Sequence, residues 1–374
     1  MNERIIHLPV IAAALTAAVL TVPVVALASA PDESVVPSRM CGPYFYIPIE
    51  VDGPDDGSRV TLNALFDTGG AQLSIDPQTV ERILGRKVEH GDPVRLRNAT
   101  AGPMSFGALK PRAWSMEHLS RLIGMEIDLF LPFRAFRDVL LTLDFPRREI
   151  RVGKGRLPSP DGVEVFDARG RDRRPYLSIT IGGRERRLLA DSGSSGSISI
   201  REDGPLRWAS GPSPLRVAQT MESVTFQEIG RLDEEIDIAG VPIPAPIVTL
   251  TEGQELIGTD VMSRFAWTFD QRSRRMRIHP SSREALELEG VRGTGAITKP
   301  ADTGLEIVRV LPETPADVAG LLAGDVVVAV NGTPVYEQGC ERWDEREQDD
   351  DTALTVRRGA RSFDVSLSRV VLVP

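Results

Sequence analysis

The chain has 374 residues, enough for two or three domains that each bury a core of their own. Apolar residues make up 41% and charged residues 26% of the chain, a composition that does not favour disorder. The net charge of −9 and the pI near 5.2 come without a long Lys/Arg cluster, which argues against a nucleic-acid partner because phosphate groups are bound by clustered cations.

The N-terminus predicts an export signal. Arg4 is followed by an almost uninterrupted apolar run from Ile5 to Ala28 that ends in small residues. We expect cleavage after Ala28, which makes residues 1–28 a signal peptide and the mature protein periplasmic or extracellular. The alternative is an uncleaved membrane anchor, because the run is long enough to span a bilayer. No second stretch approaches that length.

Cys41 and Cys340 are the only cysteines, so the sequence does not predict a disulfide-dense small domain. In an oxidising compartment the two could pair and tie the N-terminal part to the C-terminal part. They could equally be unpaired, and the sequence leaves both possibilities open.

A hairpin and an Asp loop occur twice. Residues 44–75 and 174–200 each contain an alternating strand, a Gly turn, a second apolar strand, an Asp-hydroxyl-Gly triplet and another short strand. The first triplet starts at Asp67 in "ALFDTGG" and the second at Asp191 in "LLADSGS". The repeated order predicts two halves of similar fold.

A second pair of segments keeps the same spacing. The strand ending at Asp144 lies 77 residues after Asp67, and the matching strand ending at Asp270 lies 79 residues after Asp191. We therefore predict a mainly β protein with two lobes, and the segment between them is rich in Gly, Pro and charge. The predicted limits are lobe 1 at 42–154, a linker at 155–173 and lobe 2 at 174–280.

The two Asp loops are the candidate catalytic site. If the lobes pack about a pseudo-twofold axis, Asp67 and Asp191 face each other and cannot both stay ionised, so they share one proton. The ionised carboxyl can then accept a proton from water while the protonated one donates to a carbonyl oxygen. The alternative is that each triplet forms a surface turn in which the Asp side chain caps its own backbone.

The residues beside each aspartate fit the same hypothesis. Gly69 and Gly193 permit a tight backbone turn that aims N–H groups at the carboxylates. Thr68 and Ser192 supply hydroxyl groups that can bond across the axis and join the two loops.

These triplets and their spacing resemble those of pepsin-type or retropepsin-like aspartic peptidases that carry both lobes in one chain. The resemblance implies two acid-protease β-barrel lobes, peptide-bond hydrolysis by water activated between Asp67 and Asp191, no cofactor or metal, and a monomer that holds both aspartates. It also implies a supporting Leu-Ile-Gly segment behind each Asp loop. Lobe 2 has it at Leu256-Ile257-Gly258, whereas in lobe 1 Leu131 is followed by Pro132.

The resemblance further implies a hairpin, the flap, that folds over the substrate. The four tyrosines, Tyr44, Tyr46, Tyr176 and Tyr336, lie outside the expected stretch. We predict the flap at residues 98–111 with Phe106 as its apolar tip, and an ordinary hairpin turn is the alternative.

Residues 290–370 resemble a PDZ domain of the kind found in bacterial secreted proteases. Such domains add a C-terminal peptide as a strand to a sheet edge. We expect that edge at "GTGAIT" (293–298), with Gly295, Ala296 and Ile297 beside the peptide. The matching positions of the motif are Thr314, Pro315, Ala316, Ala319, Gly320, Leu321, Gly324, Asp325, Asn331 and Gly332.

Other chemistries are less well supported by the sequence. "DSGSSGS" fails the G-x-S-x-G pattern because Ser197 stands two positions after Ser195, and His90, His118 and His279 show no recognisable partner spacing. No HExxH or paired-cysteine motif predicts a metal site. The predicted function is an exported aspartic-type endopeptidase with a PDZ domain for recruitment of substrate or partner. The alternative is a catalytically inactive secreted protein that binds peptides in the two-lobed cleft and the PDZ domain.

Overall fold

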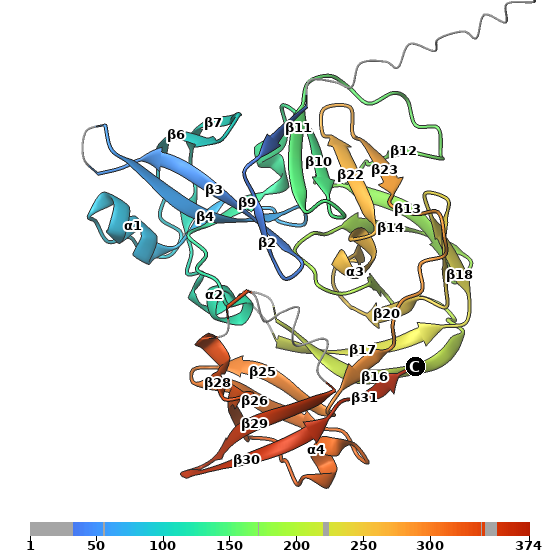
Figure 1. The fold of residues 1–374 in the computed structure, drawn as a ribbon. Helices are drawn as coiled ribbons and strands as arrows, with labels where there is room; N and C mark the ends of the chain where they lie inside the picture. The colour runs from blue at the N-terminus through green and yellow to red at the C-terminus, as the bar shows by residue number, and fades with distance from the viewer. Residues whose placement is uncertain (1–32, 55–56, 171, 220–223, 338, 341–349) are drawn as a thin grey trace, which may run out of the picture. The chain divides into compact units, whose positions relative to one another are not determined.

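The computed structural model describes residues 33–374 except 55–56, 171, 220–223, 338 and 341–349 (Figure 1). The predicted signal peptide, residues 1–28, lies outside the described residues. The described chain is mainly β, and its longest helix, α1 (Pro77–Leu84), has eight residues. None of the described helices is long and apolar enough to cross a membrane.

The first half of the chain forms an eight-stranded sheet in the described residues. Its strand order is β7-β6-β3-β4-β9-β5-β8, with β2 paired to β3. The helix α1 follows β5 because Asp76 caps its first turn by accepting from the Gln78 N–H, and Gly85 ends it with φ of 63°. The strands are β2 (Arg39–Cys41), β3 (Tyr44–Asp52), β4 (Arg59–Asp67), β5 (Ser74–Ile75), β6 (Leu96–Ala101), β7 (Met104–Leu109), β8 (Arg112–Ala113) and β9 (Leu129–Pro132), and the further helices are α2 (Glu117–Ile123) and η1 (Phe133–Phe136).

The second half forms a seven-stranded sheet with corresponding pairings. The strand that carries the Asp loop pairs in parallel with a later strand in both halves, β4 with β9 and β14 with β21. Each later strand also pairs antiparallel with the short strand that follows the loop. The sheet contains β13 (Tyr176–Ile181), β14 (Arg184–Ala190), β15 (Ile198–Ile200), β16 (Trp208–Gln219), β17 (Val224–Leu232), β20 (Ile247–Leu250) and β21 (Leu256–Ile257); β18 (Glu235–Ile238) pairs with β19 (Val241–Pro244), and α3 spans Thr259–Met262.

A third sheet takes strands from both halves. Its order is β1-β11-β10-β22-β23-β12, and β10 pairs antiparallel with β22 so that Thr142 lies opposite Thr268. The hydroxyl groups of these two threonines are 2.9 Å apart. The strands are β1 (Glu33–Val36), β10 (Leu140–Asp144), β11 (Glu149–Gly153), β12 (Val165–Asp167), β22 (Phe265–Asp270) and β23 (Arg275–Pro280).

The predicted linker 155–173 differs from a plain connection, because it contains β12, which pairs with β23. Leu157 and Val165 are buried against Leu140, and the Leu157 N–H donates to Asp270 at 3.1 Å. The apolar residues of this segment therefore bury on the shared sheet, a contact that its Gly- and Pro-rich composition conceals. Strand β1 likewise extends the folded region to before residue 42.

One apolar core runs through both halves. It joins residues of the first sheet, such as Phe66 and Phe136, to Trp267 and Phe269 of the shared sheet and to Ile257 in the second half. Trp267 is fully buried and its Nε1–H donates to the Met262 carbonyl at 3.1 Å. The two halves are therefore not independent folding units, because each lacks part of the core.

The C-terminal residues build a further sheet with its own core, centred on Ile307, Leu321 and Val356. Its order is β25-β26-β27-β29-β30, with β28 paired to β27 and with β25 at one edge. The elements are β25 (Ala296–Ala301), β26 (Gly304–Val310), α4 (Pro315–Val318), β27 (Val326–Val330), β28 (Thr333–Pro334), η2 (Val335–Glu337), β29 (Asp351–Arg358) and β30 (Arg361–Ser368), and β24 (Val291–Gly293) pairs with β31 (Val370–Val373).

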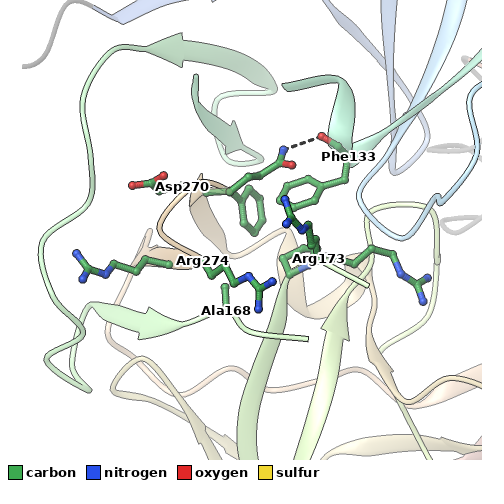
Figure 2. Close-up of a pocket in the computed structure, with 10 residues that line it drawn as sticks. Phe133, Ala168, Arg173, Asp270 and Arg274 are labelled. Atoms are coloured by element: carbon green, nitrogen blue, oxygen red, sulfur yellow. Dashed lines mark hydrogen bonds between the residues drawn. The ribbon is translucent and has the colours of Figure 1, made fainter. Parts of the chain in front are cut away.

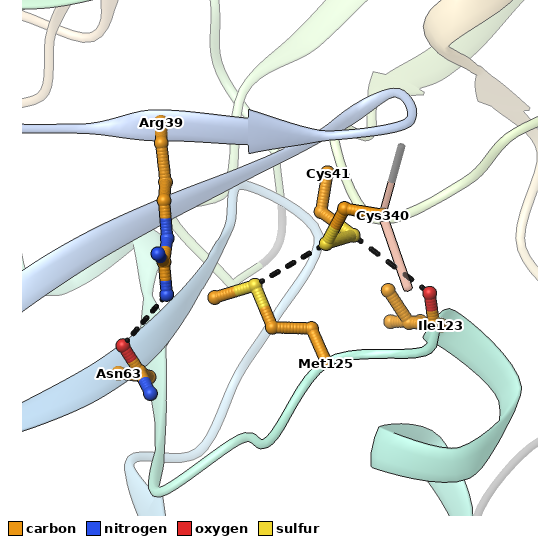
Figure 3. The surroundings of a disulfide bond; sticks show 6 residues. All are labelled: Arg39, Cys41, Asn63, Ile123, Met125 and Cys340. Carbon is orange, nitrogen blue, oxygen red and sulfur yellow. Dashed lines mark hydrogen bonds between the residues drawn. A yellow bond between two sulfur atoms is a disulfide. The ribbon is translucent and has the colours of Figure 1, made fainter. Parts of the chain in front are cut away.

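A disulfide joins Cys41, at the end of β2, to Cys340 in the C-terminal part (Figure 3). The pairing that the sequence left open is therefore present, and the bond closes a separation of 299 residues. Cys41 is fully buried, and the Cys340 sulfur lies 3.5 Å from the Met125 sulfur. The Arg121 guanidinium also lies over the Tyr336 ring, 5.8 Å from its centroid. This cation–π contact is a second link between α2 and the C-terminal part.

Replacing both Cys41 and Cys340 by Ser is expected to lower the free energy of unfolding by about 2–5 kcal/mol, because the disulfide restricts the unfolded chain over a long loop. Urea unfolding of the double variant and of the oxidised wild type measures this difference, and a non-reduced digest identifies the linked peptide. Two thiols that react in the native, unreduced protein would contradict the disulfide.

Candidate functional site

Asp67 and Asp191 stand at matching ends of apolar strands. Asp67 is the last residue of β4 and Asp191 directly follows β14, after lead-in residues that are almost completely buried. Each chain then turns tightly, with the Gly70 N–H donating to the Asp67 carbonyl and the Ser194 N–H to the Asp191 carbonyl, both at 3.3 Å. Each carboxylate also accepts from the N–H two residues later, at 2.7 Å from Gly69 and 2.9 Å from Gly193.

The two loops are joined by reciprocal hydrogen bonds. The Thr68 hydroxyl donates to the Ala190 carbonyl at 2.7 Å and accepts from the Ser192 N–H at 2.8 Å. In return the Thr68 N–H donates to the Ser192 hydroxyl at 3.0 Å. Both side chains are fully buried, so these bonds are shielded from competition with water. The hydroxyl residues at 68 and 192 thus fix the two aspartates relative to each other.

Each glycine of the triplets faces the carboxyl group of the opposite loop. A Cβ at Gly69 would lie 2.4 Å from the Asp191 carboxyl carbon, and a Cβ at Gly193 would lie 2.6 Å from that of Asp67. Neither glycine has a left-handed backbone. Glycine is therefore required by the opposite carboxyl group and not by the turn conformation that the sequence suggested.

The two carboxyl groups lie close together, and the pKa of each is raised. Burial raises the pKa of Asp67 well above its ordinary value, and the charge of Asp191 and a hydrogen bond with it raise that pKa further, against the N–H groups of Gly69 and Gly70. Burial also raises the pKa of Asp191, but the hydrogen bond from Asp67, the Gly193 N–H and the charge of Arg174 oppose the rise. Both shifts disfavour the state in which the two carboxyl groups are ionised together.

Such a pair can carry out acid–base chemistry. One carboxyl can donate a proton while the other accepts one, which is what general acid–base catalysis requires of two neighbouring groups. Both side chains keep part of their surface open, so water or a ligand can reach them.

The segments behind the loops hold them in both halves. The Asp191 N–H donates to the Ile257 carbonyl at 2.9 Å, and a Cβ at Gly258 would lie 2.1 Å from the Gly196 carbonyl oxygen, so Leu256-Ile257-Gly258 supports the second loop. In the first half Pro132 stands opposite Asp67 in the parallel pairing of β9 with β4. The substitution of Pro for Gly therefore leaves the strand register intact.

Phe106, the predicted flap tip, lies on β7, whose turn with β6 is at Gly102 and Pro103. Its ring packs edge-to-face on Phe136, with centroids 5.4 Å apart. Phe106 is therefore not at the tip of the hairpin, as predicted, because Gly102 and Pro103 form the turn. The flap role of the hairpin stays a prediction.

Gly295 directly precedes β25, and Ala296 and Ile297 are its first residues. In the part of the chain that the structure describes, β25 pairs only with β26, and β16 lies close to it. Gly295 has φ of 88°, and its carbonyl accepts from the Leu311 N–H at 2.9 Å.

Two residues near the aspartates escaped the sequence analysis. Tyr44, at the start of β3, hydrogen-bonds Ser195, and burial raises the pKa of its phenol. Arg174, two residues before β13, donates to the Gly69 carbonyl at 2.7 Å. The available signal was their position, since each lies at the beginning of its repeat, Tyr44 as the first residue of β3 and Arg174 two residues before β13.

The His90 ring packs on Trp114 with centroids 4.1 Å apart. The residues that the structure describes contain no group of three or more His, Cys, Asp or Glu side chains that could hold a metal ion.

Comparison with known proteins identifies the C-terminal sheet. The PDZ domain family matches residues 306–358. The putative serine protease HhoA of Synechocystis sp. is 56% identical over 38 residues, and the chain spans about a tenth of that protein's length because the match covers 10% of each. The chain is thus a mainly β protein with several β-sheet domains and a C-terminal PDZ domain.

Two solved structures are similar over 22% of this chain. The PDZ domain of HtrA3 bound to a phage-derived ligand (FGRWV) has 22% identity, 90% of that chain covered and a TM-score of 0.20. A PDZ domain protein from Parabacteroides distasonis has 19% identity, 21% of that chain covered and a TM-score of 0.20.

These findings contradict the predicted relationship to pepsin-type or retropepsin-like aspartic peptidases. They also contradict the predicted aspartic-type endopeptidase and its alternative, an inactive relative that binds peptides in the same two-lobed cleft. Peptide binding by the PDZ domain agrees with the family match. The family that matches is the PDZ domain, and the curated relative carries the name of a serine protease. The relationship that the comparisons support is confined to a PDZ domain and a short segment shared with HhoA.

Replacing Gly69 or Gly193 by Ala is expected to lower the free energy of unfolding by about 1–3 kcal/mol, because the new Cβ overpacks against the opposite carboxyl group. Gly253 is an exposed control, with 3.4 Å between an added Cβ and the nearest atom, and its Ala variant should change stability by no more than about 0.5 kcal/mol. Urea unfolding compares the three variants. Equal stabilities for all of them would contradict the placement of the carboxyl groups.

Proposed function

We propose that the chain binds the C-terminal ends of polypeptides at the β25 edge of its PDZ domain. The observation that carries this function is the second side of β25, which pairs with no strand of the described residues, while β26 pairs with its first side and β16 lies close to it. An extended peptide can therefore add to the sheet as a further strand, with main-chain hydrogen bonds for affinity. The HtrA3 PDZ domain was solved with a peptide ligand, which agrees with this use of a PDZ domain.

Gly295, Ala296 and Ile297 form the proposed carboxylate end of this edge. The loop before β25 is held to the start of α4, because the Ala316 N–H donates to the Thr294 carbonyl at 2.9 Å. A Cβ at Gly295 would lie 2.0 Å from the Thr314 hydroxyl oxygen, so the loop packs closely at this point. Ile297 is buried, and Ala296 is half-buried against the core of the C-terminal sheet. These contacts hold the start of β25 in place.

We also infer a second site, in which Asp67 and Asp191 act as a general acid–base pair. The specific observation in its favour is that each carboxyl group packs closely against the glycine of the other loop. Hydrogen bonds of Thr68 and Ser192 hold the two loops together. In this proposal the pair lies between two lobes, residues 42–154 and 174–280, and Phe106 belongs to a hairpin beside them. Export through residues 1–28 is part of the same proposal and would place the protein in the periplasm or outside the cell.

The peptide FGRWV with a free carboxylate is expected to bind the full chain at least about tenfold more tightly than its C-terminal amide, because the carboxylate makes charge-assisted hydrogen bonds. Gly295→Ala should abolish this preference by displacing the loop from Thr314. The control is Gly359→Asn in the β29–β30 turn, where no atom lies within 4 Å of an added Cβ and Asn accepts a left-handed backbone. Fluorescence polarisation measures the affinities. Equal binding of acid and amide would overturn the peptide-end proposal.

The acid–base pair predicts a pH dependence of stability. The folded-state pKa of Asp67 lies above the unfolded value, so the folded chain binds more protons and the free energy of unfolding falls as the pH rises through the folded-state pKa. Asp67→Asn resembles the protonated carboxyl and should remove this fall. Urea unfolding from about pH 4 upward compares it with Asp138→Asn, an exposed control. The same pH dependence in wild type and Asp67→Asn would contradict the shared proton.

A further inference from the structure

Tyr44 and Arg174 occupy corresponding positions in the two halves. Phe45 pairs with Phe66, the residue before Asp67, which brings Tyr44 level with Asp67 on the neighbouring strand. In the second half the Ala190 N–H donates to the Pro175 carbonyl at 2.9 Å, which brings Arg174 level with Asp191. The repeat therefore places one residue beside each aspartate, a tyrosine in the first half and an arginine in the second.

Arg174 is firmly held where it lies. Its Nη1 donates to the Gly69 carbonyl at 2.7 Å, across from the second half to the first Asp loop. Its Nε donates to Asp172 at 2.7 Å, and its other terminal nitrogen lies 3.3 Å from the Tyr176 hydroxyl. The Tyr176 hydroxyl also lies 3.3 Å from Gln254. These bonds fix the guanidinium group, whose side chain is 22% exposed.

Tyr44 is the neutral counterpart. Burial is the largest effect on the pKa of its phenol and raises it, so the side chain carries no charge near neutral pH. Its partner is Ser195, in the second Asp loop, just as the partner of Arg174 is Gly69 in the first loop. Arg216 of β16 lies on this side. Its positive charge lowers the pKa of the Tyr44 phenol, and its Nη1 lies close to Gly196.

Further positively charged side chains lie near Arg174. Arg174 lines a shallow pocket, partly open to solvent, between the end of the 155–173 segment and the β22–β23 turn. Figure 2 shows Arg173 and Arg274 at this pocket, near Phe133 and Asp270. Asp270 is already bonded to Arg156 and Ser273, and Asp172 is the acidic partner of Arg174 itself. The electrostatic environment of the two aspartates is thus unequal although their hydrogen bonds are nearly symmetric.

We propose that Arg174 is a positioning residue that keeps Asp191 ionised and the shared proton on Asp67. Asp191 is then the group that accepts a proton and Asp67 the group that donates one. The inference rests on the proposed acid–base pair and deepens it, because it assigns a role to each carboxyl group. The direction of the pKa shifts agrees, since the charge of Arg174 lowers the pKa of Asp191 while the charge of Asp191 raises the pKa of Asp67.

The test is a carbon-13 NMR titration of the full chain labelled at the aspartate carboxyl carbons, with Asp67→Asn and Asp191→Asn used to assign the two signals. The wild type should show one proton for the pair, located on Asp67. Arg174→Gln should raise the titration midpoint of Asp191 and spread the proton over both carboxyl groups. Arg174→Lys should restore most of the wild-type pattern, and Tyr44→Phe should leave the proton on Asp67.

Asp172→Asn provides a change of opposite sign. It removes the acidic partner of Arg174, so the midpoint of Asp191 should fall, and this outcome can be read even if Arg174→Gln fails to fold. A wild-type proton on Asp191, or midpoints that do not move in the Arg174 and Asp172 variants, would overturn the role of Arg174. Two carboxyl groups that titrate independently in the wild type would instead overturn the acid–base pair itself.

Discussion

The reciprocal bonds between Thr68 and Ser192 are the constraint on which the rest of the site depends. Each hydroxyl residue belongs to one half of the chain, and each bonds the backbone of the other half. Two loops held in this way bring their aspartates face to face, and the close approach then requires glycine at 69 and 193. Burial of both hydroxyl groups makes the bonds costly to break, because a separated partner would leave unpaired polar groups in the interior.

The shared sheet and the common core hold the two halves in this arrangement. The shared sheet pairs β10 with β22 and sets Thr142 against Thr268, so the two halves meet about matching positions here as well. The common core continues through Trp267 and leaves neither half complete without the other. The PDZ domain differs, because its apolar residues form a separate core, and the disulfide of Cys41 with Cys340 joins it covalently to the first half.

The amino-acid sequence reveals the part of this structure that repeats. The spacing of Asp67 and Asp191 within matched hairpins predicts their convergence, and the alternating strands predict a mainly β chain. The PDZ domain at its end is predicted by the resemblance of residues 290–370 to that family. The roles of Tyr44 and Arg174 depend on strand register and on contacts across the two halves, which local patterns do not specify. β12 was hidden by its Gly- and Pro-rich surroundings, and the Cys pairing depends on a distance in space. The family assignment failed because short triplets carry little family information, and the comparisons identify only the PDZ domain.

The central claim is that two carboxyl groups, one from each half, hold one proton between them. Neutron diffraction from crystals exchanged into deuterium oxide at about pH 5, above the ordinary Asp pKa of about 3.9, observes that proton directly. The account predicts a single deuteron bound to Asp67, within hydrogen-bond distance of Asp191. Two fully ionised carboxylates, or side chains turned away from each other, would contradict it.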